Sequence, residues 1–438
     1  MMTVCPLCGV LTPPVLLWKN MADQQPGNDP SAPARWLTPG VRGIGSASLL
    51  ADLGHEIPTS LLPSFLTVTL GAPAAALGLI EGLADCAAGL ARFGGGALAD
   101  DPEQRRRSAL GGYTSTAVFS SLIGLTATVW QVALFRVLAW TARGLRVPAR
   151  NALLADVVPP AVYGRAYGFE RAMDNFGAIG GPLLALALVA VVSVRTAMLV
   201  SVVPGLLATL AILYAIRHAP RLTERVRQPI RLHVRPVLRG RLGRFMVGVA
   251  CFELGNVAAT LLILRAVDVF GLGRSHSAAT QLALLLYALY NLAATVSSIP
   301  AGRTGDRYGM SPVLVVGVLL FLVAYLGLAG GGIPLLVLAF VAAGLAIGCI
   351  ETAQHAAVAT VAPVELRGSA FGLLATVQSF GNLAASAVAG LIWSVVSASA
   401  AFLYLAAWMV AALVAFTLAD RGARQVDETL PVADRPSP

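Results

Sequence analysis

Two long stretches of this sequence, Gln281–Pro300 and Ser311–Ile350, contain no charged residue. Each is long enough to cross the hydrocarbon core of a bilayer as a helix, which needs about 20 apolar residues. The composition agrees, because 12% of the 438 residues are charged, whereas a soluble domain carries about 25%. The sequence therefore predicts a polytopic membrane protein embedded in a lipid bilayer.

Apolar runs of similar length continue along the chain, and they predict an all-α membrane protein with twelve transmembrane helices. The expected spans are 42–69, 74–98, 108–128, 130–149, 162–190, 194–217, 244–268, 278–301, 311–330, 333–358, 366–393 and 396–418. Residues 1–41, rich in Pro, Asp, Gln and Asn, are expected to form a disordered cytoplasmic tail. The other expected parts are a first half (42–217), an arginine-rich linker (218–243), a second half (244–419) and a C-terminal cytoplasmic tail (420–438).

The distribution of arginine predicts the orientation. Basic residues concentrate in alternate connections, on the side of the termini and the linker, which is the positive-inside pattern of cytoplasmic loops. That side carries Arg105–Arg107, Arg143, Arg146, Arg150, Arg165, Arg303, Arg307 and Arg367, and the opposite side carries Arg195 and Arg274. We expect a multi-pass protein of the plasma (inner) membrane with both termini in the cytoplasm. The net charge of +9 follows from this pattern and does not indicate nucleic-acid binding.

The sequence does not predict an enzyme, a metal site or a cofactor. Cys5 and Cys8 form one Cys-x-x-Cys pair, without the second pair or the histidines that a zinc site needs. His55-Glu56 lacks the second histidine of a metalloprotease helix, and no Walker loop indicates ATP-driven pumping. We expect a monomer.

The second half of the sequence repeats features of the first half about 200 residues later. The pattern Pro159-x4-Gly164-x-Ala166-Tyr167-Gly168-x7-Phe176-Gly177 returns as Pro363-x4-Gly368-x-Ala370-Phe371-Gly372-x7-Phe380-Gly381, with an offset of 204 residues. Two further matches, Gly96-x3-Asp100 with Gly302-x3-Asp306 and Asp52-Leu53-Gly54-His55 with Glu253-Leu254-Gly255-Asn256, follow the same order. Such a duplication predicts two parallel halves with a substrate site between them near the bilayer midplane.

The segment Gly302–Gly309 is expected to form a charged turn between the two charge-free stretches. Its Gly-x-x-x-Asp-Arg-x-Gly pattern resembles the cytoplasmic loop motif of the major facilitator superfamily. The resemblance implies two parallel six-helix bundles over roughly 42–419, and a gating role for Gly302, Asp306, Arg307 and Gly309. The first-half copy at Gly96 and Asp100 lacks the basic residue and the second glycine, so we do not expect equivalent gates.

The series Gly168-x8-Gly177-x3-Gly181-Pro182 resembles the fifth-helix signature of the antiporter branches of this superfamily. The resemblance implies export by antiport, and helix packing alone is the alternative. A glycine-rich helix with an internal proline is expected to bend and to pack tightly against a neighbour in the other half.

Five titratable residues on the first two spans are candidates for proton coupling. Asp52 and Glu56, with His55 between them, lie about 15 Å into the first span and share one helix face. Glu81 and Asp85 have the same spacing on the second span. We expect these residues to cluster and to exchange protons near neutral pH, because low dielectric opposes ionisation of neighbouring carboxyls. Structural ion pairs of these residues with Arg92 or Arg136 are the alternative.

Other polar residues at midplane depth are candidates for a substrate cavity. Arg136 resembles the buried arginine of an antiporter fourth-helix motif, and we expect it to pair with Asp174. The remaining candidates are Asn175, Glu253, Asn256, Asn291, Gln378 and Asn382. Glu351, Gln354 and His355 are expected near the cytoplasmic end of their helix, as part of a gate.

These observations lead to one main functional hypothesis and two alternatives. The main hypothesis is a secondary active transporter that exports a small organic compound in exchange for protons by alternating access. The first alternative is a metabolite importer or facilitator of the same superfamily. The second is a membrane receptor on a transporter fold, which would have no need to keep four buried acids.

Overall fold

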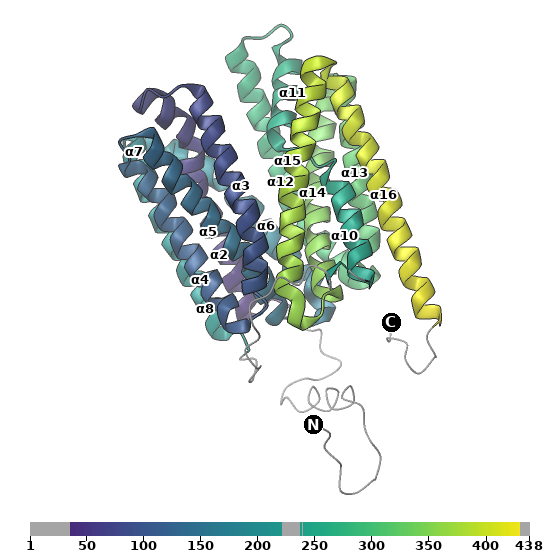
Figure 1. The fold of residues 1–438 in the computed structure, drawn as a ribbon. Coiled ribbons are helices and arrows are strands. Elements are labelled where there is room, and N and C mark those ends of the chain that lie inside the picture. The colour runs from purple at the N-terminus through teal and green to yellow at the C-terminus, as the bar shows by residue number, and fades with distance from the viewer. Residues whose placement is uncertain (1–35, 221–236, 239, 430–438) are drawn as a thin grey trace, which may run out of the picture. The chain divides into compact units, whose positions relative to one another are not determined.

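The computed structural model describes residues 36–220, 237–238 and 240–429, which are helical and contain no strand (Figure 1). The Cys5–Cys8 pair, most of the first tail, most of the linker and residues 430–438 lie outside this part of the chain. The first group of helices is α2 (Pro39–Ser64), α3 (Ala74–Leu98), α4 (Pro102–Leu122), α5 (Val129–Asp156), α6 (Tyr163–Val189), α7 (Val194–Val200) and α8 (Val202–His218). The second group is α10 (Gly240–Glu253), α11 (Ala259–Gly271), α12 (His276–Tyr308), α13 (Met310–Gly330), α14 (Ile333–Val361), α15 (Arg367–Val395) and α16 (Ala398–Thr429).

The helices pack as two groups, coloured purple to teal and teal-green to yellow in Figure 1. In the first, α2 packs on α6 and α8, and α5 packs on α3 and α4. In the second, α13 packs on α14 and α16, and α12 packs on α11 and α14. The two groups meet mainly where α6 packs on α12 and α14, and where α3 and α5 pack on α15. We call the groups the first and the second bundle.

Seven helical segments of the described chain are long and apolar enough to cross a membrane. They are Pro160–Val189, Val194–His218, Ala278–Tyr308, Met310–Gly330, Ile333–Val361, Val364–Val395 and Ala398–Ala419. Large apolar side chains on their surfaces are exposed, such as Leu186, Val296 and Leu391, as expected for helices that face lipid. The other five expected spans coincide with α2, α3, α4, α5 and the α10–α11 pair, and twelve crossings stay a prediction.

Three helices extend beyond their expected ends by seven residues or more. The segment Gly302–Tyr308 is the last part of α12 and not a turn, and the chain reverses at Gly309 alone, with φ of +87°. A left-handed φ of this kind is open to glycine without steric cost. α16 likewise continues to Thr429, past the expected start of the C-terminal tail. The third helix, α5, continues to Asp156.

The length of α5 corrects the assignment of three arginines to a connection. Arg143, Arg146 and Arg150 lie inside α5, and Arg146 and Arg150 are buried. They belong to the interior of the first bundle, so they no longer support the predicted orientation.

The expected continuous span 244–268 is interrupted between α10 and α11. Side chains from neighbouring helices satisfy the unwound backbone. Ala258 N donates to Ser386 Oγ at 2.9 Å, Tyr325 Oη donates to Gly255 O at 2.8 Å, and Asn382 Nδ2 donates to Asn256 O at 2.7 Å. Non-helical backbone at membrane depth requires such partners, and the interruption carries Asn256 to the space between the bundles.

Candidate functional site

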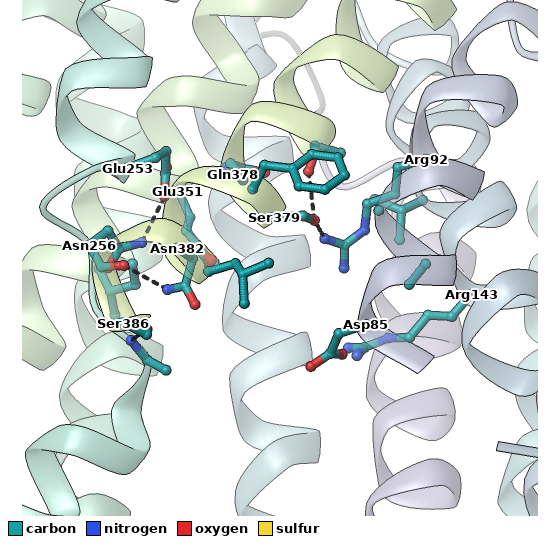
Figure 2. A pocket seen from close by; sticks show the side chains of 18 of the residues that line it. Asp85, Arg92, Arg143, Glu253, Asn256, Glu351, Gln378, Ser379, Asn382 and Ser386 are labelled. Carbon is teal, nitrogen blue, oxygen red and sulfur yellow. Dashed lines mark hydrogen bonds between the residues drawn. The ribbon is translucent and has the colours of Figure 1, made fainter. Parts of the chain in front are cut away.

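A cavity of about 490 Å³ lies between the two bundles. The first bundle contributes residues of α3, α5 and α6, and the second contributes residues of α10, α14 and α15. In Figure 2, Asp85, Arg92 and Arg143 lie across the cavity from Glu253, Asn256 and Asn382. Its volume falls within the range of about 300–1,000 Å³ that small-molecule sites occupy.

Buried ion pairs link α5 and α6 beside this cavity. Glu170, fully buried, accepts from Arg171 Nε at 2.7 Å and lies 2.6 Å from Arg150 Nη1. Asp174 lies 3.4 Å from Arg150 and 3.3 Å from Arg171. The expected Arg136–Asp174 pair is therefore wrong, because two other arginines surround Asp174. Glu170, Arg150 and Arg171 were not among the sequence candidates.

The same cluster reaches the second bundle through Glu351. Its Oε2 lies 3.7 Å from Arg171 Nη1, and Glu351 and His355 line the cavity. Glu351 and His355 lie ten and six residues before the end of α14 at Val361, and their expected role in a gate stays a prediction. His355 also packs against the rings of Tyr167 and Phe371. Glu351 and His355 therefore belong to the cavity wall.

The proton-coupling candidates of α2 form a row next to the cavity wall, in which Asp52 and His55 are buried and Glu56 is partly exposed. His55 Nδ1 lies 3.4 Å from Asp52 Oδ1, and its Nε2 lies 3.4 Å from Glu56 Oε1. Arg143, which lines the cavity, is 3.9 Å from Asp52. The expected proximity of Asp52, His55 and Glu56 is confirmed, and Arg143 connects this row to the cavity.

The acids of α3 have separate partners. Glu81 lies 2.9 Å from Arg136 Nη2, whose guanidinium stacks 3.3 Å from the centroid of the Trp140 ring. Asp85 lines the cavity and accepts from Trp140 Nε1 at 3.1 Å. Glu81 thus forms the structural ion pair that was the alternative to proton coupling.

Amides connect the candidates of the second bundle around Glu253. The Glu253 carboxyl accepts from Asn256 Nδ2 at 2.9 Å and from Gln354 Nε2 at 3.2 Å. Gln378 Nε2 donates to Gln354 Oε1 at 2.8 Å. Glu253, Asn256, Gln378 and Asn382 line the cavity. Gln354, expected with Glu351 near the helix end, is fully buried inside this network.

Two candidate amides have local partners and do not line this cavity. Asn291 Nδ2 donates to Tyr287 O at 3.0 Å, and Asn175 Nδ2 donates to Arg171 O at 3.0 Å. Both bonds reach back one turn of the same helix. The structure therefore gives neither side chain a contact with the cavity.

Asp52 and Glu253 occupy related positions in the two bundles. An added Cβ at Gly177 of α6 would lie 2.8 Å from Asp52 Cβ, and one at Gly381 of α15 would lie 2.5 Å from Glu253 Cβ. Gly181 packs in the same way against Glu56. The antiporter-like glycines Gly177 and Gly181 thus pack within the first bundle, contrary to the expected contact with the other half.

Other glycines of the repeat do join the bundles. An added Cβ at Gly168 would overlap the carbonyl oxygen of Ser298 on α12, and one at Gly164 would overlap that of Gly302. On the other side, an added Cβ at Gly96 would lie 2.7 Å from Gly372 Cα on α15. Pro182 lies inside α6 beyond these contacts.

Two aspartates hold the bundles together next to these glycines. Asp306 accepts from Gly164 N at 2.6 Å, from Arg165 N at 3.1 Å and from Arg165 Nε at 2.8 Å. Asp100 accepts from Ser369 N at 2.8 Å and from the Ser369 hydroxyl. Each carboxylate meets the first turn of a helix in the other bundle, where negative charge is favoured. The two contacts between the bundles are therefore alike in geometry, and Arg165 makes the Asp306 contact the more strongly charged one.

The guanidinium of Arg307, another residue of the expected gating motif, lies 5.1 Å from the ring of Tyr308 on the same helix.

The contacts of Asp100 and Asp306 lie at the end of the bundles where α8 ends and α10 begins. Arg106 Nη2 donates there to Pro220 O at 2.7 Å. We call this end of the two bundles the linker end. The contacts of Asp100 and Asp306 close the space between the bundles there.

The described helices thus enclose a polar cavity of small-molecule size between two bundles. The Major Facilitator Superfamily model matches residues 44–287 and 271–436, and the chain belongs to this family, whose members are transporters. An uncharacterised MFS-type transporter of Methanocaldococcus jannaschii is 29% identical over 373 residues, which cover 84% of this chain and 92% of that protein.

Two further comparisons are informative. A gentisate transporter of Corynebacterium glutamicum is 27% identical over 313 residues, which cover 66% of each chain. The fold is similar to that of a bacterial homologue of the iron transporter ferroportin in an outward-facing state, with a TM-score of 0.70, 15% identity and coverage of 87% and 99% of the two chains.

Proposed function

We propose that this protein is a proton-coupled secondary transporter that exports a small organic compound by alternating access. The observation that carries the proposal is the cavity between the bundles, closed at the linker end by Asp100 and Asp306. Alternating access needs a central site and a closure that can be exchanged for its opposite. The proposal keeps the division into halves at 42–217 and 244–419 and places the linker end in the cytoplasm.

Proton coupling is assigned to the row Asp52, His55 and Glu56. Asp52 and His55 are 4% and 3% exposed, and Asp52 Oδ1 and His55 Nε2 have no hydrogen-bond partner in the described residues. Buried titratable groups with unused hydrogen-bonding atoms are suited to accept and release a proton. Arg143, 3.9 Å from Asp52, would transmit the charge of the row to the cavity.

Proton-driven uptake into inverted vesicles tests this function. Vesicles with an acidified lumen are given a panel of small compounds, including gentisate because a relative is named as its transporter. We expect one or more compounds to enter only with the gradient present, and a pH-sensitive dye to report proton release. Asp52→Asn combined with Glu56→Gln should abolish both signals. The exposed Glu103→Gln, which pairs with Arg107 at 2.5 Å, should leave them unchanged.

Two outcomes contradict the proposal. Full uptake by the double variant would remove the coupling role from the α2 row. Accumulation of the compound in whole cells that express the protein would favour the alternative, import or facilitation of a metabolite.

A further inference from the structure

The two walls of the cavity carry different charged and polar groups. Five arginines line it, all from the first bundle: Arg92, Arg143, Arg146, Arg150 and Arg171. The second-bundle wall carries carboxyl and amide groups, including Glu253, Asn256 and Asn382 (Figure 2). An arginine within a membrane protein needs a compensating partner, so the partners of the five decide what the cavity can accept.

Arg150 and Arg171 are compensated by the protein itself. Glu170 lies within 2.7 Å of both guanidinium groups, and Asp174 lies 3.4 Å from the first and 3.3 Å from the second. Three carboxylates, Glu351 included, therefore surround two cations. These two arginines have no capacity left for a ligand charge.

The other three arginines lack such partners in the described residues. Arg92 donates to the Ser379 hydroxyl, has a buried Nε without a hydrogen-bond partner, and has no carboxylate within 4.0 Å. Arg146 stacks 4.1 Å from the centroid of the Tyr113 ring, and its Nε is also without a partner. For Arg143, the nearest carboxylate oxygen lies at 3.9 Å, on Asp52.

The opposite wall offers hydrogen-bond acceptors. The amide nitrogens of Asn382, Gln378 and Asn256 donate within the protein. The side-chain oxygens of Asn382 and Gln378 accept no hydrogen bond from the described residues, and both side chains line the cavity. An amide oxygen in this position requires a donor such as a hydroxyl group.

We propose that the substrate is a small organic acid that carries hydroxyl groups, bound as its anion. Its carboxylate lies between Arg92 and Arg143, and its hydroxyl groups donate to the amide oxygens of Asn382 and Gln378. Ile350, Phe380 and Leu383 line the same cavity and supply apolar contact for a carbon skeleton. This assignment rests on the proposed function, because it names the compound class that the central cavity takes.

A charge series of otherwise matched compounds tests the assignment. The full chain in lipid nanodiscs is titrated with 4-hydroxybenzoate, 4-hydroxybenzamide and 4-hydroxybenzylamine, and with lactate and lactamide. Binding is followed by the unfolding temperature and by tryptophan fluorescence, since Trp140 contacts the cavity-lining Asp85. We expect saturable binding of an acid, with its amide and amine weaker by about tenfold or more, because the charge-assisted bonds are lost.

Variants identify the arginines that bind the acid. Arg92→Gln and Arg143→Gln should each weaken acid binding by about tenfold or more, and Arg92→Lys and Arg143→Lys should restore part of it. Arg107→Gln, on an exposed side chain that pairs with Glu103, should bind the acid normally. The unfolding temperature without ligand identifies any variant that fails to fold, and the lysine variants then carry the comparison.

Binding of the amide or amine as tightly as the acid overturns the assignment, and so does the absence of saturable binding by either acid. The proposed function fails separately. Proton-driven uptake of a neutral or cationic compound would leave transport standing without an anion site. Acid binding without proton-driven uptake would leave the anion site standing without the proposed coupling.

Discussion

Asp306 is a single carboxylate that accepts three hydrogen bonds from the other bundle. Two come from backbone N–H groups at the start of α6, and the third comes from the Arg165 guanidinium. Hydrogen bonds to a charged group contribute about 1.5–3 kcal/mol each to stability. A neutral amide at this position would keep the shape of the side chain and lose most of that stabilisation.

Asp306→Asn is therefore expected to open the linker end. The loss of even one such bond, about 1.5–3 kcal/mol, shifts a two-state equilibrium by about 10–150-fold. Spin labels at Arg107 and Tyr308, whose side chains are exposed, report the separation of the bundles by pulsed electron resonance, after the native cysteines are replaced by serine. The longer-distance population should grow in this variant.

Asp101→Asn is the matched control for this measurement. Asp101 caps α4 by accepting from Glu103 N and Gln104 N at 2.9 and 2.8 Å, and thus acts within its own bundle. Equal distance distributions in Asp306→Asn and Asp101→Asn would contradict the closing role of Asp306.

The interaction partners of individual side chains were the feature that the sequence predicted least well. The sequence placed Asp52, His55 and Glu56 together because helical spacing alone determines which residues share a face. It failed for the expected pair of Arg136 and Asp174, whereas the alternative of an ion pair between Arg136 and an acid of the first two spans holds for Glu81. Those pairs depend on how α3, α5 and α6 are rotated about their axes, and rotation is set by packing between helices rather than by spacing along one of them.

The contact between α3 and α15 depends on glycine at one position of α3. An added Cβ at Gly96 would lie 2.7 Å from Gly372 Cα and 2.9 Å from Gly368 O. Gly94, two residues earlier, has no atom within 4 Å of its added Cβ. Alanine gains about 1 kcal/mol of helix propensity over glycine at either site, so the two substitutions differ only in the contact they disturb.

Gly96→Ala should hold the bundles apart, and Gly94→Ala should not. Overpacking of this kind costs about 1–3 kcal/mol, and here the bundles can avoid it by separating at the linker end. The same spin-label pair should show a larger separated population for Gly96→Ala only. Identical behaviour of the two variants would show that α3 and α15 tolerate a methyl group between them.

The interrupted segment between α10 and α11 yields a prediction about the stability of the second bundle. Ser386→Ala removes the acceptor of Ala258 N, and Tyr325→Phe removes the donor to Gly255 O. A buried polar group left without a partner costs about 1–3 kcal/mol, so each variant should unfold at a lower temperature than the native protein. Ser394→Ala serves as the control, since its exposed hydroxyl bonds to Leu391 O on the same helix. A normal unfolding temperature in both test variants would contradict this role.

Helix positions were well predicted, and the composition of the cavity wall was only partly predicted. Long apolar runs locate helices because the bilayer demands about 20 residues of them. The positive-inside pattern assigned Arg143, Arg146 and Arg150 to the cytoplasmic side, although the first two lie within the expected span 130–149. Their spacing of three and four residues places them on one helical face, and this was the available signal that they line a polar interior.

The orientation of the whole molecule in the membrane stays a prediction. With the linker end in the cytoplasm, Thr429 lies inside the cell, and Gly331, at the far end of α13, lies outside. Alkaline phosphatase is active only outside the cytoplasm. A fusion after Gly331 should therefore be active and one after Thr429 inactive, with the reverse result for fluorescent-protein fusions. The opposite pattern would invert the topology.

The bond between Arg92 and Ser379 joins α3 of one bundle to α15 of the other. The proposed carboxylate would bind the same guanidinium, so the resting contact and the cargo compete for one group. An unloaded carrier then keeps its internal tether, while a loaded one has exchanged it for the ligand. Binding of the cargo would then weaken one contact between α3 and α15, while the contacts of Asp100 and Gly96 between the same bundles remain.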